Sequence, residues 1–174
     1  MSSRIILNSQ VINDLIFSNT LELQTKFQKN NGKNYFFMPN IGIKLFNAKV
    51  SWIDPFKKNI SFAFNKYENL ALLNMLRYIN EKLTMVYNKK SSYPKPLSPF
   101  LFEKDDSFYI RCYLPNTRGK YHIESYFNND TEGFSIPKMS CVYNIIVIDI
   151  RNIWEDDNKS GFNLELKETS VILV

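Results

Sequence analysis

The chain of 174 residues has the length of one domain, and its 44% apolar and 22% charged residues are those of an ordinary globular protein. No apolar run approaches the roughly 18 residues that span a membrane. Residues 1–10 lack the long apolar core of a signal peptide, so we expect an intracellular protein with a single domain, 1–174. The net charge is +5, and residues 1–95 hold 14 Lys and Arg against 5 Asp and Glu. This surplus favours an anionic partner, although Lys-rich surfaces are also common without one.

The first half of the chain reads as strands followed by one helix. Arg4–Phe17 fits a helix and a strand equally well. Alternation and β-branched or aromatic content predict the strands Leu21–Phe27, Tyr35–Met38 (interrupted by Pro39), Ile41–Trp52 and Ile60–Phe64, with Asn31-Gly32 as a hairpin turn. In the long strand, one face is predicted to carry Phe46, Ala48, Val50 and Trp52 and the other Asn47, Lys49 and Ser51.

The period changes at Tyr67. Apolar residues recur at spacings of four and three up to Tyr87, which predicts a helix with one buried stripe and Asn65 as a candidate cap: Leu72, Leu76, Ile79, Leu83 and Val86. Residues 88–99 contain three prolines among basic residues and are predicted to form a mobile, extended loop.

The second half is predicted to be almost entirely strands. Ser107–Leu114 and Lys120–Phe127 are expected to form a hairpin around Asn116–Gly119. Val142–Trp154 is apolar enough to be a central strand covered on both faces. An acidic hairpin loop at 155–161 then leads into the closing strand Phe162–Leu173. This order predicts a mainly β fold with one central α-helix, either an OB-like small barrel or an antiparallel sheet, and the alternative is an α+β sandwich. In an OB-fold the helix would lie between strands three and four.

The residues that enzymes use are scarce. The one histidine, His122, lies on a predicted strand, and the chain has no nucleophile elbow, P-loop or dinucleotide-binding glycine pattern. Cys112 and Cys141 are expected to be free, buried thiols, too few to build a zinc site with a single histidine. The carboxylates of Asp149 and 155–157 are more typical of a solvated turn than of a magnesium site. We therefore expect no enzyme activity, no metal and no cofactor.

The strand Ser107–Leu114 carries the most informative pattern. Alternation places Phe108, Ile110, Cys112 and Leu114 on one apolar face and Tyr109, Arg111 and Tyr113 on the other. An outward row of ring, cation and ring suits single-stranded nucleic acid, because rings stack on bases and the guanidinium meets phosphate or stacks itself. The same row also occurs on ordinary strands, where Tyr pairs across strands and Arg lies over its neighbours.

Basic and aromatic residues recur together outside that strand. If the loops border one groove, these residues extend the predicted nucleic-acid site: Arg118, Lys120 and Tyr121; Lys89, Lys90, Tyr93 and Lys95; Lys44, Lys49 and Trp52. No motif supplies the fixed bidentate donors that read base edges, so we expect binding without sequence specificity.

The segment 150–173 joins an apolar strand, Trp154, an acidic turn and Ser160-Gly161-Phe162-Asn163-Leu164-Glu165-Leu166. It resembles the C-terminal hairpin of OB-fold single-stranded-DNA-binding proteins from phages, large DNA viruses and virus-like linear plasmids. The resemblance implies a replication protein that coats exposed strands in the cytoplasm or at a viral replication site. Many such proteins end in an acidic tail, whereas this chain ends in the mostly apolar 168–174, which can pair in the sheet or with another subunit.

Three functions are compatible with these sequence features. The leading hypothesis is sequence-tolerant binding of single-stranded DNA in replication. The alternatives are a viral structural or assembly protein that acts through protein–protein interfaces, and an RNA-binding or transcription-associated factor. The expected partners are single-stranded DNA or RNA, with self-association as a further option and no membrane.

Overall fold

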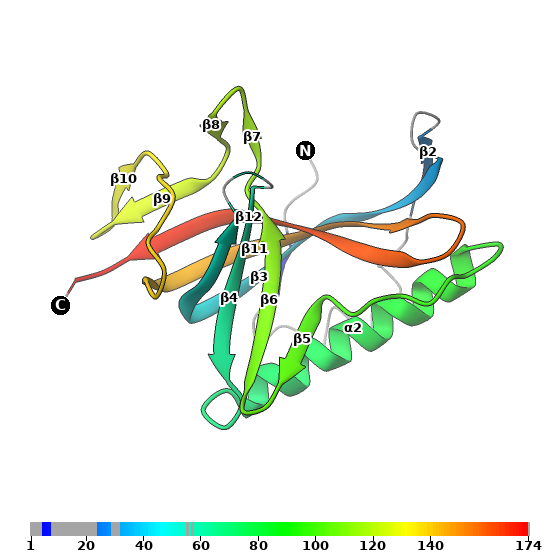
Figure 1. Cartoon of the computed structure of the whole chain (residues 1–174), viewed down its shortest axis with the longest axis horizontal. Coiled ribbons are helices and arrows are strands. Elements are labelled where there is room, and N and C mark those ends of the chain that lie inside the picture. The colour runs from blue at the N-terminus through cyan, green and yellow to red at the C-terminus, as the bar shows by residue number, and fades with distance from the viewer. Residues whose placement is uncertain (1–4, 8–23, 29–31, 55, 57, 174) are drawn as a thin grey trace.

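The computed structural model describes residues 5–7, 24–28, 32–54, 56 and 58–173. Most of the predicted segment Arg4–Phe17 lies outside these residues, whereas residues 24–27 of the predicted strand Leu21–Phe27 are described and form a strand. Strands dominate the described chain, so the fold is mainly β (Figure 1). Its elements are β1 (Ile5–Leu7), β2 (Gln24–Gln28), β3 (Lys33–Asp54), β4 (Asn59–Asn65), α2 (Leu70–Lys90), β5 (Leu101–Lys104), β6 (Ser107–Tyr113), β7 (Asn116–Thr117), β8 (Lys120–Tyr121), β9 (Glu124–Phe127), β10 (Asp130–Glu132), β11 (Val142–Glu155) and β12 (Ser160–Val171).

One large mixed sheet organises the molecule, in the order β10-β9-β12-β11-β3-β4-β6-β5. β1 pairs with β3 in parallel, and β2 pairs with the beginning of β3 in an antiparallel hairpin. β12 also meets β6, in parallel, at the single pair Glu165–Tyr113. Because this contact is one residue pair long, the sheet is not closed into a barrel.

The long strand β3 buries opposite faces in its two halves. Ile41, Ile43 and Leu45 are buried in the first half, and Ala48 and Val50, which point the other way, are buried in the second. The sheet therefore coils around the core along β3. Pro39 does not end the strand as predicted. Pro39 lies instead where the pairing of β3 with β11 shifts in register, between the residue pairs Ile150–Ile41 and Asn152–Phe37. A proline fits such a position because it has no N–H to donate to the strand ladder.

The predicted helix is confirmed and lies against the sheet, where it connects β4 to β5 (Figure 1). Its buried stripe contains Leu73, Leu76, Ile79 and Leu83. The helix begins at Leu70, three residues later than predicted, and Asn69 rather than Asn65 occupies its N-cap position. Asn65 Oδ1 accepts hydrogen bonds from the backbone N–H groups of residues 67 and 68 and so builds a separate turn. In the described part of the chain, no helix is long and apolar enough to cross a membrane.

The predicted hairpin between Ser107–Leu114 and Lys120–Phe127 is wrong. β6 pairs instead with β4 along seven residue pairs, and this register stacks Phe64 on Phe108 and places two further apolar pairs in the core. Its other neighbour is β5, which joins β6 through the two-residue turn Asp105-Asp106. The segment Lys120–Phe127 divides into β8, which pairs only with β7, and β9, which runs parallel to β12. The two residue pairs of β7 and β8 bury little, whereas the pairing with β4 buries a complete apolar face.

The predicted central strand and closing hairpin are confirmed as β11 and β12. Residues 146–150 of β11 are all buried, as expected for a strand covered on both faces. Glu155 was predicted in the solvated turn but is a buried carboxylate. It accepts hydrogen bonds from the Tyr87 hydroxyl at 2.5 Å, the Ser91 hydroxyl at 2.7 Å and the Asn34 amide at 3.0 Å. Burial raises the pKa of this carboxyl, but these donors and the charge of Lys95 outweigh it, so the pKa lies below its ordinary value.

The segment after the helix has no helix or strand between residues 91 and 100, apart from a bridge between Leu97 and Ser160. It is attached to the start of β12, because the Ser160 hydroxyl donates to the carbonyls of Lys95 and Pro96 and the Ser98 N–H donates to the Ser160 carbonyl. These hydrogen bonds hold the segment against the start of β12. Residues 88–90, which were predicted to begin the loop, belong instead to α2, and the mobility of the segment stays a prediction.

Candidate nucleic-acid interface

The alternation predicted for β6 is confirmed. Phe108, Ile110 and Cys112 are buried, whereas Tyr109 is half-buried and Arg111 and Tyr113 are exposed. The registers of the neighbouring strands place one row of side chains across this outer face at Trp52, Ser61 and Arg111, and the next row at Lys49, Ala63, Tyr109 and Phe102. We call this outer surface of β3, β4, β6 and β5 the aromatic face.

A β-bulge brings Trp52 to the aromatic face. Strict alternation, as predicted from the sequence, would put Trp52 on the same face as Val50, and that prediction is wrong. The register between β3 and β4 shifts between Val50 and Trp52, so that Ser51 is inserted and Trp52 pairs with Ser61 on the outside. The Ser51 hydroxyl donates to the Ser61 carbonyl at 3.0 Å. The indole of Trp52 is 38% exposed.

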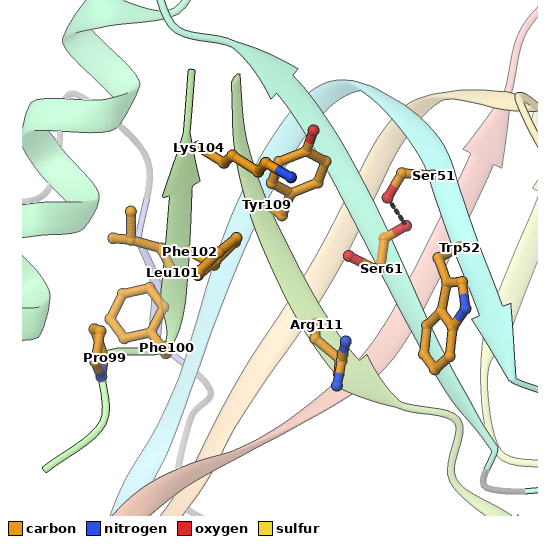
Figure 2. A pocket seen from close by; sticks show the side chains of 10 residues that line it. All are labelled: Ser51, Trp52, Ser61, Pro99, Phe100, Leu101, Phe102, Lys104, Tyr109 and Arg111. Carbon is orange, nitrogen blue, oxygen red and sulfur yellow. Dashed lines mark hydrogen bonds between the residues drawn. The ribbon is translucent and has the colours of Figure 1, made fainter. Parts of the chain in front are cut away.

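The middle of the aromatic face is hollow because β4 contributes small residues there. Ser61 lies between Trp52 and Arg111, and Ala63 lies between Lys49 and Tyr109. The result is an open depression of about 560 Å³, which we call the first depression (Figure 2). Its lining combines three aromatic side chains of the aromatic face with two cations and the end of the post-helix segment: Trp52, Phe102, Tyr109, Lys104, Arg111, Ser51, Ser61, Pro99, Phe100 and Leu101.

Cations and rings meet at contact distance in this depression. The Arg111 guanidinium lies 4.8 Å from the centre of the Trp52 ring, a cation–π contact. The rings of Phe102 and Tyr109 are 6.3 Å apart and tilted by 41°, and Phe102 is 63% exposed. Such an arrangement offers ring faces and edges to planar ligands and one guanidinium to an anion.

A second depression of about 280 Å³ adjoins the first and shares Pro99, Phe100 and Arg111 with it. It begins at Tyr113, 39% exposed, and continues to the start of β12. Its other lining residues are Asn59, Ser98, Cys112, Trp154, Gly161, Phe162, Asn163 and Leu164. The two depressions therefore meet at Arg111, the central residue of the predicted row.

The remaining predicted residues lie outside both depressions. Lys49 is exposed beside Ala63, whereas Lys44, five residues earlier on β3, points to the opposite face and lies 5.7 Å from the ring of Phe46. Arg118 and Lys120 are exposed on the small β7–β8 hairpin.

Tyr121 packs edge-to-face on Phe134 and contacts the core, so it is a structural residue. Lys89 and Lys90 occupy the last turn of α2, where they complement the negative end of the helix dipole. Tyr93 is 79% exposed and Lys95 half-buried in the segment that follows. The structure thus brings together Trp52, Tyr109, Arg111 and Tyr113, and it does not place these other residues beside them.

Sequence reasoning missed Phe102 and Lys104 on β5. Their signal was present, because the two residues alternate with Leu101 and Glu103 ahead of an Asp-Asp turn. The three prolines just upstream concealed it. The small residue Ser61 gave no signal, because only the pairing of β4 between β3 and β6 makes it the floor of a depression.

The histidine and the two cysteines of the chain lie in different surroundings. The His122 ring lies on the surface with Nε2 at 2.7 Å from Thr117 Oγ1. Cys112 and Cys141 are free thiols, and burial raises the pKa of both. Among the described residues, no three His, Cys, Asp or Glu side chains gather in a way that could hold a metal ion. In comparisons with known proteins, no protein-family model and no curated protein matches the chain.

Proposed function

We propose that this protein binds single-stranded DNA without sequence specificity and without catalysis, through the aromatic face. The observation that carries the proposal is the concave arrangement of Trp52, Phe102 and Tyr109 around Arg111, above a floor of small residues. Planar rings on a solvent-exposed sheet stack on bases, and a guanidinium among them neutralises phosphate.

The same arrangement favours single strands over duplexes. The faces of bases are available for stacking only when the bases are not already stacked in a helix. Base-edge readout needs donors held in fixed bidentate geometry. In the described part of the first depression, the charged donors are Arg111 and Lys104 on flexible side chains, so their contribution is to the backbone.

We further propose that the sheet is an elaborated OB-like fold. The arrangement of five strands supports this proposal. β3, β4 and β6 are consecutive in the sheet, and β11 and β12 continue the sheet from the other side of β3. β12 also approaches β6 in parallel. The helix departs from the expected pattern, since α2 precedes β5 and β6 rather than following them. A role in coating DNA during replication rests on the resemblance of 150–173 to the closing hairpin of single-stranded-DNA-binding proteins.

A second candidate function, assembly through protein–protein contacts, is favoured by apolar side chains near the C-terminal end of the described chain. Phe127, Ile172 and Leu173 are 37%, 39% and 66% exposed. Asn128, directly after β9, holds this end, because its N–H donates to the Val171 carbonyl and its Oδ1 accepts from the Leu173 N–H. These side chains are therefore presented on an ordered edge. A viral assembly component would use such an edge for a neighbouring subunit.

Fluorescence anisotropy of a labelled oligo(dT) at two salt concentrations tests the proposal. We expect saturable binding at low salt that weakens as salt rises, because each phosphate contact releases counterions. The variant Tyr109→Ala should bind about 5- to 150-fold more weakly, since base–aromatic stacking contributes about 1–3 kcal/mol. Equal-length RNA as competitor separates DNA from RNA preference. A stable oligomer with no binding at low salt would favour assembly and contradict the proposal.

A further inference from the structure

The tryptophan that lines the second depression has a cation on its ring, as the tryptophan of the first depression has. The Lys33 ammonium lies 4.6 Å from the centre of the Trp154 ring, as the Arg111 guanidinium lies 4.8 Å from the centre of the Trp52 ring. Each pair joins strands that are distant in sequence, and each tryptophan lines one of two adjoining depressions. The chain has only two tryptophans, and both stand in this arrangement.

Gly161 makes the position of Trp154 possible. The two residues are directly opposite each other on β11 and β12, and a Cβ atom at Gly161 would lie 2.8 Å from the indole. Real Cβ atoms do not approach that closely, so any other residue would displace the ring. The glycine thus lets the indole lie flat on the sheet, at the end of the second depression.

We infer that Trp154 is a second base-stacking station, and that the ligand is a polynucleotide strand that crosses Arg111 from one depression to the other. The inference rests on the proposed function. It extends the binding surface from Tyr109, Arg111 and Tyr113 on β6 to the far end of the second depression at Trp154. Arg111 lines both depressions and so can hold the backbone between the two stations. Lys33 supplies the matching positive charge at the second station.

The cation on each ring marks the face that a base would occupy. A cation–π contact at an exposed site contributes less than base stacking on an aromatic side chain does. An incoming base therefore displaces the cation from the ring, and the released cation moves to the adjacent phosphate. The acidic turn that follows Trp154, with Asp156 and Asp157, repels phosphate and ends the track there.

Two single-tryptophan variants, Trp52→Phe and Trp154→Phe, test the inference by fluorescence with oligo(dT) of increasing length. In each variant the remaining indole reports on one station while the other keeps an aromatic ring. We expect a long oligo(dT) to quench both tryptophans over the same concentration range. We also expect Trp154→Ala to weaken binding of the long oligonucleotide about 5- to 150-fold, with a smaller loss for oligonucleotides too short to reach both stations.

Gly161→Ala provides a test that keeps the indole and all charges. It should displace Trp154 and weaken long-oligonucleotide binding, while leaving the quenching of Trp52 intact. If Trp52 is quenched at saturation but Trp154 is not, and Trp154→Ala binds within twofold of wild type, the second station is refuted and the proposed function stands. If oligo(dT) quenches neither tryptophan at low salt, both fail. Should Trp154→Ala not fold, quenching in the Trp52→Phe chain decides the matter.

Discussion

Replacement of Arg111 by alanine tests the centre of the aromatic face. In the bound state a guanidinium–phosphate contact contributes about 1.5–3 kcal/mol. Forming it requires Arg111 to leave the Trp52 ring, 4.8 Å away, at a cost of about 0.5–1 kcal/mol. The difference is about 1–2 kcal/mol, so Arg111→Ala should weaken oligo(dT) binding about 5- to 30-fold. The dependence of log affinity on log salt should also fall by about 0.7, the value for one phosphate contact on a single strand.

Arg151→Ala is the matched control. It removes the same charge from an exposed arginine on β11 that lies outside both depressions. The Arg151 Nε atom lies 3.7 Å from Glu165 Oε2. Both variants lose one positive charge, so an effect of net charge alone would be equal in both. Apart from that common effect, Arg151→Ala should change oligo(dT) affinity by less than twofold. Anisotropy titrations of both variants at several salt concentrations provide the measurement. Equal losses in the two variants would mean that binding follows net charge rather than the aromatic face, and would refute the reasoning.

Three further changes separate the binding surface from the fold. Ser61→Val fills the floor of the first depression with a residue that favours strands, so oligo(dT) affinity should fall while the melting temperature stays equal or rises; unchanged affinity would show that the hollow is not used. Tyr87→Phe removes the hydroxyl that donates to Glu155 and should lower the free energy of unfolding by about 1–3 kcal/mol in urea denaturation, with DNA affinity retained. The folded-state pKa of Glu155 lies below its unfolded value of about 4.3, so the ionised carboxylate stabilises the fold fully above that value and loses this contribution as pH falls through the folded pKa. The difference in free energy of unfolding between wild type and Glu155→Gln should therefore shrink below about pH 5. A difference that stays constant with pH would contradict the burial of an ionised Glu155.

The elements with a strong local signal were predictable. The four-and-three spacing of apolar residues identified α2, and the continuous apolar run of β11 identified a strand covered on both faces. Alternation on β6 gave the outward direction of Tyr109, Arg111 and Tyr113, because a strand of regular period leaves no other choice.

What the sequence could not provide depends on long-range pairing. Trp52 reaches Arg111 only because β4 lies between their strands and because Ser51 is inserted as a bulge, and a single inserted residue has no signature in an alternating pattern. Glu155 was assigned to solvent because its neighbours are acidic. Its burial depends on donors that are distant in sequence, namely the hydroxyls of Tyr87 and Ser91 and the amide of Asn34.

Photocross-linking of a bound oligo(dT), followed by mass spectrometry of the tryptic peptides, tests the location of the binding surface most directly. Tyr67 and Phe56 are 77% and 94% exposed and lie outside both depressions, so they report what exposure alone would capture. We predict cross-links at Trp52, Phe102, Tyr109 or Tyr113 that a competing unlabelled strand removes. Cross-links confined to Tyr67, Phe56 or other residues away from the depressions would contradict binding on the aromatic face.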